Sequence, residues 1–157
     1  MVTDIDTGLP VFLLDGEECI VKGDQVFQDG RRILLFSTDE HLRILARARE
    51  ILGDGTFRIT PHLWCQTFII SANIGGSTFV PVAYCLLPDK KKESYLAMFS
   101  MLKDALQKLD LELAAEFFMS DFEFAIRDAF QTVFENIEIK GCVFHFTKAV
   151  LSKVRDR

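Results

Sequence analysis

The sequence predicts one α/β domain built on a mixed β-sheet. Its 157 residues are enough for one hydrophobic core. Along the chain the apolar patterns read as a hairpin of strands, then helix, strand, helix, strand and helix. A hairpin pairs antiparallel, whereas a strand–helix–strand connection favours parallel pairing. We therefore expect antiparallel strands at one edge of the sheet and parallel strands at the other.

The composition is that of a globular protein with no bulk preference for nucleic acid. The chain is 49% hydrophobic and 26% charged, with a net charge of −5. These values exclude a disordered tail and a coiled coil, and a negative chain does not attract DNA as a whole. DNA contact would depend on a basic cluster, at Lys90–Lys92 or at the end bearing Lys148, Lys153, Arg155 and Arg157. Solvated surface is the plainer interpretation of both clusters.

The N-terminus and the cysteines predict an intracellular protein with reduced thiols. Asp4 and Asp6 lie where a signal peptide needs positive charge. No C-x-x-C spacing joins the four cysteines, which are Cys19, Cys65, Cys85 and Cys142.

The segment 59–88 contains no Asp, Glu, Lys or Arg and is long enough to cross a bilayer. Its residues are β-branched and aromatic, however, and a Gly-Gly pair at 75–76 interrupts it. Two buried strands, 64–74 and 78–87, fit this pattern better than one membrane helix. Pro81 cannot donate to a ladder, so the second strand should be an edge strand or be bulged there.

Residues 1–35 are expected to form an N-terminal arm or a small extension before a domain of residues 36–157. They are acidic and contain Asp-Gly and Gly-Asp turn signals. Short apolar stretches, such as residues 11–14, predict small strands there.

A helix should begin at Ser37, because Ser37 and Glu40 have the spacing of a capping box. The end of this helix is open between two alternatives. It runs to Leu52, before a glycine C-cap, or it stops near Ala46 so that residues 49–57 form a strand.

The remaining elements follow from apolar spacing. Apolar residues three and four apart predict helices, and a second capping box, Ser120-x-x-Glu123, marks a helix start. The predicted order after the hairpin is helix 93–109, strand 115–119, helix 120–134, strand 137–144 and a final helix from about His145.

Two aspartates are the candidate site residues. Asp54 lies between two glycines, and because Asp-Gly is a strong turn signal, a turn is the plainer local interpretation. Asp121 follows the buried strand 115–119, at the strand end where ligands collect in α/β sheets. Its alternative role is that of an acid in the first helical turn, stabilised by the helix dipole.

If the strands carrying Asp54 and Asp121 pair, both carboxylates point into one small site. Two neighbouring carboxylates repel each other, and a divalent cation relieves the repulsion. Mg²⁺ suits them, as a hard cation that takes oxygen ligands and retains water. A site with two such metals activates water and stabilises both oxygens in phosphodiester displacement.

Several motifs in order also carry a family resemblance. They are FSTDEHLRIL, DGTF, PHLWCQ, VPVAYCLL, the tyrosine of ESYLAMF, SDFEFAIRDAF and GCVFHF. With these motifs the chain resembles the catalytic domain of Mutator-like element (MULE) transposases, from about Phe36 to Val154.

The resemblance implies a ribonuclease H-like fold, in which helices flank a five-stranded mixed sheet of order 3-2-1-4-5. It makes residues 50–57 the central first strand and so turns Asp54 into a metal ligand. It also implies DDE-type DNA transposition in the nucleus, with Mg²⁺ or Mn²⁺ held by Asp54 and Asp121. The family's C-x-x-H motif falls on Cys142 and His145.

The family's third acid, a glutamate, lies well downstream of the C-x-x-H motif, beyond a helical insertion. The sequence stops at Arg157, in the first helix after that motif, so we expect a core truncated before its final catalytic helix. Glu123 is a poor substitute because it follows Asp121 by two residues and has a capping role. No third carboxylate is therefore identified, and the chain is expected to be inactive by itself.

A zinc site is an alternative use of Cys142 and His145. A structural zinc needs four ligands, and His62-x-x-Cys65 offers a mirrored pair. In the expected strand order the two pairs lie on opposite sides of the central strand. We therefore expect Cys142 to be a small buried residue and His145 to lie near the acidic site.

Three functions compete on these observations. The first is a MULE transposase core, with DNA as a partner bound weakly by this chain and with no membrane partner; a homo-oligomer is left open. The second, from another class, is a domesticated and inactive DNA- or protein-binding module, favoured by the acidic charge and the missing glutamate. The third is a metal-dependent nuclease whose site is completed by another acid.

Overall fold

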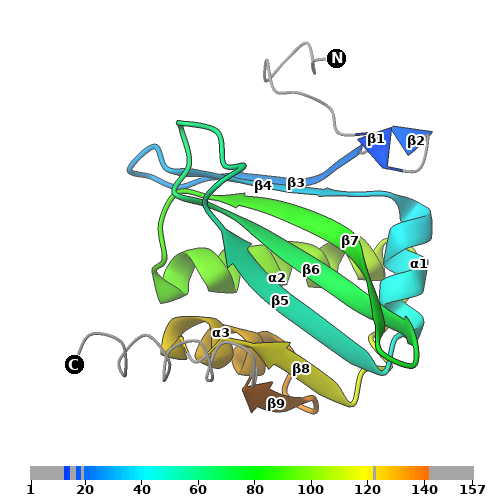
Figure 1. The fold of residues 1–157 in the computed structure, drawn as a ribbon. Helices are drawn as coiled ribbons and strands as arrows, with labels where there is room; N and C mark the ends of the chain where they lie inside the picture. Colours follow the sequence, from blue (N-terminus) through cyan, green and yellow to red (C-terminus); the bar gives the residue numbers. More distant parts are fainter. Residues whose placement is uncertain (1–12, 15–16, 19, 122, 142–157) are drawn as a thin grey trace.

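The structure of the protein, a computed structural model, describes residues 13–14, 17–18, 20–121 and 123–141 (Figure 1). The described part contains nine strands: β1 (Leu13–Leu14), β2 (Glu17–Glu18), β3 (Ile20–Val26), β4 (Arg32–Ser37), β5 (Glu50–Thr56), β6 (Gln66–Gly75), β7 (Thr78–Leu87), β8 (Phe117–Ser120) and β9 (Glu138–Gly141). Its helices are α1 (Asp39–Arg47), α2 (Lys92–Gln107) and α3 (Phe124–Val133).

Strands β3 to β9 form one seven-stranded sheet in the order β3-β4-β7-β6-β5-β8-β9 (Figure 1). Strand β5 pairs parallel with β8, and β8 pairs parallel with β9. The other neighbours pair antiparallel. The predicted mixed sheet, with antiparallel strands at one side and parallel strands at the other, is confirmed.

The expected number of strands and their overall order are wrong. The sheet has seven strands rather than five, because the β3–β4 hairpin extends it beyond β7. The reason lies in β4, whose residues from Ile33 to Ser37 are all buried. A strand that is apolar on both faces must be covered on both. Ile33 and Leu35 belong to the main core, and Leu34 and Phe36 belong to a second cluster. Strand β4 is accordingly an interior strand, between β3 and β7.

The residues expected to form an N-terminal arm therefore include two strands of the main sheet. Strand β4 spans the division proposed at residue 35, and the division itself stays a prediction. Strands β1 and β2 form a separate two-stranded sheet.

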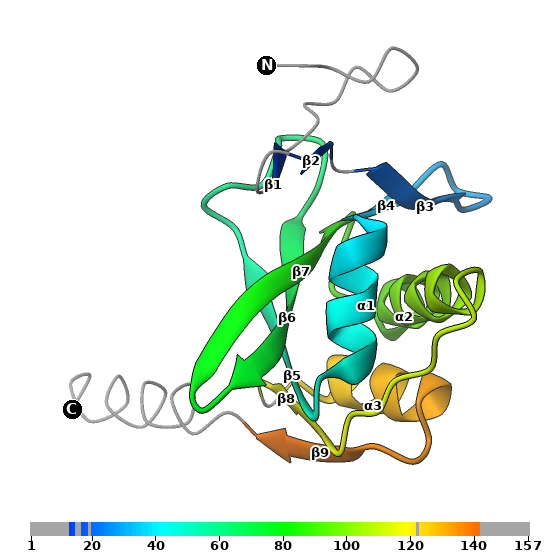
Figure 2. The same cartoon turned by 90° about the vertical axis from the view of Figure 1, so that its right-hand side faces the viewer.

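All three described helices lie on the same side of strands β5, β6 and β7 (Figure 2). Their apolar faces and the facing side of the sheet make one core. Its centre is a group of packed aromatic rings, which are Phe68, Tyr95, Phe99, Phe118 and Phe130. On the opposite face a smaller cluster of Leu34, Phe36 and Leu86 packs with Trp64.

Helix α1 takes the shorter of its two alternatives, since it ends at Arg47 and β5 begins at Glu50. Its predicted cap at Ser37 is wrong. Thr38 is the N-cap, with its hydroxyl accepting from the His41 amide at 3.1 Å. The Ser37 hydroxyl is buried and donates instead to the Val82 carbonyl of β7 at 2.7 Å. The helix start does not need this hydroxyl, because Thr38 already caps it.

The second predicted capping box is also wrong. Helix α3 begins at Phe124, and Glu123, its N-cap, makes no side-chain capping bond. The Ser120 hydroxyl donates to the Asp121 carbonyl at 3.1 Å. The strand continues to Ser120 and the helix begins only at Phe124, so the helix starts too late for this pair.

The hairpin of β6 and β7 follows its prediction closely. Gly75 and Gly76 at its tip have φ values of 139° and 57°, which glycine adopts without steric cost. The ladder is bulged at Pro81, where Ser71 pairs with Pro81 directly after Ile70 pairs with Ala83. The predicted bulge is confirmed, while β7 is an interior strand. No helix in the described part is long and apolar enough to span a membrane.

The later elements lie in the predicted order. Helix α2 spans Lys92–Gln107 and β8 spans Phe117–Ser120, each slightly shorter than predicted, and β9 begins at Glu138, one residue later than predicted. Residues 142–144 of the predicted strand and the final helix from His145 lie outside the described residues.

Candidate functional site

Asp54 lies within strand β5 and is exposed. It pairs with Ile69 of β6 in the antiparallel ladder. The local turn interpretation of Asp54 is therefore wrong, and the strand alternative from residue 49 onward is confirmed.

The glycines beside Asp54 are explained by close packing rather than by a turn. A Cβ added at Gly53 would lie 2.8 Å from the ring tips of both Phe118 and Phe68. A Cβ added at Gly55 would lie 2.4 Å from Oε1 of Gln66. Side chains alternate along a strand, so the glycines admit neighbours on the helix-covered face while Asp54 belongs to the other face.

The register of β5 and β8 brings the two predicted aspartates to the same edge of the sheet. The last pair in this parallel ladder is Leu52 with Met119. Asp54 lies two residues beyond Leu52, and Asp121 lies two residues beyond Met119. Both acids therefore follow the ladder at the carboxyl ends of adjacent parallel strands, where α/β sheets collect ligands.

Asp121 lies one residue past β8 and forms a local turn. Its Oδ1 accepts a hydrogen bond of 3.1 Å from the backbone amide of Glu123. This side-chain-to-backbone bond is typical of aspartate in turns. One oxygen of the Asp121 carboxylate is thus oriented by the amide of Glu123, the N-cap residue of α3.

A polar relay lies beside this turn and was not predicted from the sequence. Gln66 Nε2 donates to the Tyr95 hydroxyl at 2.7 Å, and that hydroxyl lies 3.2 Å from Oε1 of Glu123, to which it donates. Tyr95 is fully buried, and Gln66 is 2% exposed. Burial raises the pKa of the Tyr95 phenol above its ordinary value, and the negative charges of Glu123 and Asp121 raise it further against the effect of Gln66.

One signal for this relay is present in the sequence. The glutamine of PHLWCQ and the tyrosine of ESYLAMF are among the motifs of the family resemblance. The spacing of apolar residues in the helix predicted at 93–109 placed Tyr95 on its apolar face. Nothing in that spacing showed that the Tyr95 hydroxyl contacts Gln66 and Glu123.

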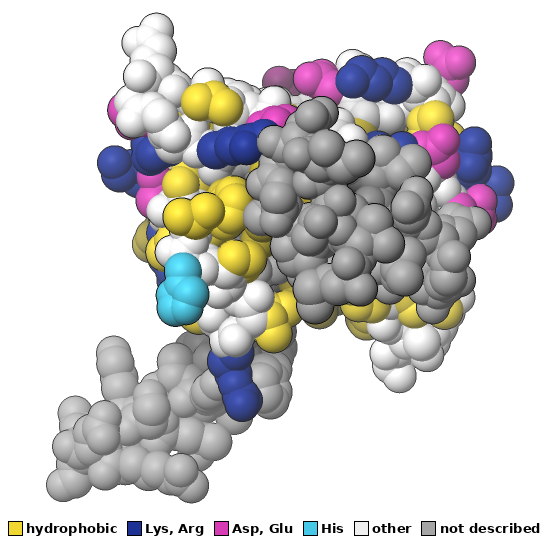
Figure 3. All heavy atoms as spheres, turned by 90° about the horizontal axis from the view of Figure 1, so that it is seen from above, with side chains coloured by type: hydrophobic (Ala, Val, Ile, Leu, Met, Phe, Trp, Pro, Cys, Tyr) yellow, Lys and Arg dark blue, Asp and Glu magenta, His cyan; other side chains and the backbone are white. Residues whose placement is uncertain are grey.

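The surface next to the relay combines a lysine with exposed apolar residues. Lys90 Nζ lies 4.6 Å from the centre of the Phe57 ring and 3.9 Å from Oε2 of Glu123. Phe57 opens the β5–β6 loop, in which Ile59 and Leu63 are also exposed. Figure 3 looks down on this end of the molecule and shows hydrophobic side chains gathered beside lysine or arginine side chains.

The donor set at the strand ends fits a hard divalent cation. Asp54 is exposed and Asp121 is half-buried, so a hydrated ion could reach carboxylate oxygens, the ligands that Mg²⁺ prefers. Within the described residues, no group of three or more His, Cys, Asp or Glu side chains could hold a metal ion. Two carboxylates can supply part of the shell of one ion, and water would supply the rest.

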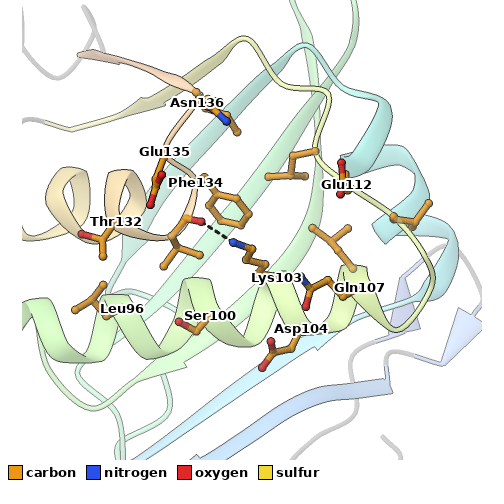
Figure 4. A pocket seen from close by; sticks show the side chains of 15 residues that line it. Leu96, Ser100, Lys103, Asp104, Gln107, Glu112, Thr132, Phe134, Glu135 and Asn136 are labelled. Carbon is orange, nitrogen blue, oxygen red and sulfur yellow. Dashed lines mark hydrogen bonds between the residues drawn. The ribbon is translucent and has the colours of Figure 1, made fainter.

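One pocket in the described part lies away from the candidate aspartates. It has a volume of about 650 Å³ and lies between α2 and α3, with walls that include Leu96, Lys103 and Phe134 (Figure 4). Lys103 Nζ donates to the Val133 carbonyl at 3.1 Å across it. None of its lining residues is one of the candidate aspartates or a member of the relay.

The cysteine predictions are tested only in part. Cys65 and Cys85 are free thiols, and burial raises the pKa of the Cys85 thiol above its ordinary value. His62 and Cys65 lie in the β5–β6 loop. Cys142 and His145 lie outside the described residues, so the C-x-x-H motif and its zinc alternative stay predictions.

The chain was compared with known proteins. No curated protein matches it. The family model of the MULE transposase domain matches residues 51–149, which is more than half of the 157 residues and includes Asp54 and Asp121. The chain therefore belongs to the MULE transposase domain family.

Proposed function

We propose that the chain carries the core of a DDE-type DNA transposase, in which Asp54 and Asp121 bind Mg²⁺ or Mn²⁺. The main support for this proposal is the β5–β8 register, in which both aspartates follow the last paired residues of two adjacent parallel strands. Family membership supplies the reaction class, namely transposase-related chemistry on DNA.

The sheet supports a ribonuclease H-like core within the seven strands. Five adjoining strands, β7-β6-β5-β8-β9, have the order 3-2-1-4-5 when they are numbered from β5. The β3–β4 hairpin then lies outside this core as an addition next to β7. In this arrangement β5 is the first strand, and it carries Asp54.

Each aspartate has a distinct role in the proposed site. Asp54 lies within β5, two residues beyond the ladder with β8, and its backbone is held by the pairing with Ile69 of β6. Asp121 comes from a turn and has one oxygen bonded to the Glu123 amide, which leaves the other oxygen for a cation. When bound, such cations activate water and stabilise the oxygens of a phosphodiester.

Cation binding is the experiment that tests this proposal. We expect Mn²⁺ to bind the parent chain, as measured by the loss of the free-ion signal in electron paramagnetic resonance. Asp54→Asn and Asp121→Asn should each abolish binding, because each removes a charged ligand. Asp104→Asn, which changes an exposed acid on α2, should bind as the parent does. Unchanged binding in Asp54→Asn would refute the proposed site.

A second candidate, a domesticated binding module without chemistry, is favoured by the net charge of −5. Such a module has no need of a cation. Absence of Mn²⁺ binding in the parent, together with DNA or protein binding that is indifferent to Asp54→Asn, would favour this candidate.

A further inference from the structure

We propose that Gln66 and Tyr95 are positioning residues, whose buried hydrogen bonds hold the Asp121 turn in register with β5. The inference rests on the proposed function, because it concerns how the two cation-binding segments are held together. It assigns a role to two family-motif residues that touch neither the cation nor DNA in the proposed site.

The relay begins against the backbone of β5. Gln66 is the first residue of β6 and is buried. Its Oε1 lies so close to Gly55 that an added Cβ would approach it to 2.4 Å. Gly55 directly follows Asp54, so the Gln66 amide rests on the segment that carries the first aspartate.

Tyr95 connects that amide to the next segment. Its ring packs edge-on against Phe68, with centroids 5.9 Å apart, and this packing fixes where the hydroxyl lies. The hydroxyl accepts from Gln66 Nε2 at 2.7 Å and donates to Glu123 Oε1 at 3.2 Å. A carboxylate only accepts hydrogen bonds. Hydrogen-bond donation therefore runs from Gln66 to Tyr95 and from Tyr95 to Glu123.

Glu123 passes the constraint to Asp121. Its side chain is held by Tyr95, while its backbone amide donates to Asp121 Oδ1 at 3.1 Å. The other partner of its carboxylate is Lys90 at 3.9 Å, a half-exposed ion pair of the kind that contributes little. Of these two contacts, the Tyr95 bond is therefore the one that holds the Glu123 carboxylate.

The relay supports the expectation that Glu123 is not a third metal ligand. Its carboxylate is engaged by a phenol and a lysine, and it belongs to no metal-binding group in the described part. Outer-shell hydrogen bonds of this kind orient ligands, and their loss typically lowers metal affinity about 10- to 100-fold.

The test uses the full 157-residue chain and removes one oxygen. Tyr95→Phe keeps the ring and deletes the hydroxyl. Leu102→Val is the matched control, because Leu102 is also buried on α2 and its truncation loosens the core without touching the relay. Two quantities are measured: the Mn²⁺ dissociation constant and the hydrogen-exchange rate of the Glu123 amide by NMR in metal-free protein.

We expect Tyr95→Phe to weaken Mn²⁺ binding about 10- to 100-fold and to speed exchange of the Glu123 amide, while Leu102→Val changes neither by a comparable factor. An exchange rate in Tyr95→Phe equal to that of the control overturns the relay, whatever the metal does. Faster exchange of the Glu123 amide in Tyr95→Phe, together with no Mn²⁺ binding by the parent chain, supports the relay and counts against the proposed function instead.

A double variant separates positioning from stability. Tyr95→Phe with Gln66→Met replaces both polar partners by apolar groups, which removes the unpaired buried amide left by the single change. We expect the melting temperature to recover relative to Tyr95→Phe while Mn²⁺ affinity stays low. Recovery of affinity together with stability would overturn the positioning role.

Discussion

At the residue scale, the glycines on either side of Asp54 show how packing dictates sequence in this strand. Gly53 faces the aromatic core, where the rings of Phe68 and Phe118 occupy the space of a side chain. The strand that presents the Asp54 carboxylate on the opposite face therefore needs a residue without a side chain at position 53. Protein interiors are packed too densely to absorb even one added methyl without movement.

Gly53→Ala should destabilise the fold by about 1–3 kcal/mol through overpacking. The gain of about 0.4–1 kcal/mol from a less flexible unfolded chain offsets only part of that cost. Urea denaturation measures the change. In the double variant with Phe118→Leu the cost of Gly53→Ala should fall, because the smaller side chain makes room; additive effects of the two changes would contradict the packing argument.

Residue patterns predicted Asp54 and Asp121 but not the side chains around them. Local patterns favoured a turn role for Asp54 and left a helix-start role open for Asp121, and the family resemblance made Asp54 a candidate metal ligand. Gln66, Tyr95 and Glu123 meet across long sequence separations, and periodicity reports only which face of an element is apolar. The cap at Ser37 failed for a related reason, since its hydroxyl bonds to β7.

At the element scale, the β3–β4 hairpin is tied to the start of α2 by one arginine. Arg31, after the hairpin turn, donates to Asp89 at 2.6 Å and to Glu93 at 2.9 Å. Asp89 also accepts from the Ser94 hydroxyl at 2.7 Å and from the Lys91 amide at 2.9 Å. Asp89 therefore serves the helix start, whose N-cap residue has no side-chain capping bond.

This arrangement predicts a loss of stability in acid that Asp89 helps to cause. Burial opposes ionisation of Asp89, but hydrogen bonds from Ser94, Lys91 and Arg31 outweigh it and hold the pKa of the carboxyl below its ordinary value. A carboxyl with a lowered folded-state pKa stabilises the fold above its unfolded pKa, which is about 3.9. That contribution is lost as the pH falls from about 4 through the folded-state pKa.

Urea midpoints at pH 7, 5, 4 and 3 measure this dependence. Asp89→Asn should lower the midpoint at pH 7 and should show a shallower fall below pH 4 than the parent. Asp110→Asn, which changes an exposed aspartate after α2, should keep the parent's profile. An equally steep fall in Asp89→Asn would assign the acid sensitivity to other groups.

The existence and order of the elements from α1 to β9 could be predicted, whereas the hairpin's place in the sheet could not. Alternating and helical patterns are local, and they located β6, β7 and α2 within a few residues. The pairing of β4 with β7 is a tertiary choice. Only the apolar run from Ile33 to Phe36 hinted at a strand buried on both faces.

At the scale of the whole molecule, the fold places both aspartates at one edge while the three described helices lie on a single side of the strands (Figure 2). The site therefore depends on long-range pairing, since β5 and β8 are separated in the chain by β6, β7 and α2. The pocket between α2 and α3 shares no lining residue with the two aspartates or the relay (Figure 4).

The isolated chain should not cleave DNA, even though it should bind one cation. Two-metal chemistry needs ligands that hold both ions about 4 Å apart, and in the described residues no third acidic, histidine or cysteine ligand joins the two aspartates. A misplacement of about 1 Å can cost roughly a hundredfold in rate. The net charge of −5 also disfavours DNA, whose affinity for proteins depends largely on phosphate neutralisation.

A nicking assay on supercoiled plasmid measures this, with Mg²⁺ or Mn²⁺ and with Asp54→Asn and Asp121→Asn as controls. We expect the parent to leave the plasmid as intact as either variant does, and to bind DNA weakly and only at low salt. Cleavage by the parent that disappears in both variants would contradict the prediction. It would mean that a third ligand exists within the 157 residues. The chain would then contain a complete nuclease site rather than a core that only binds a cation.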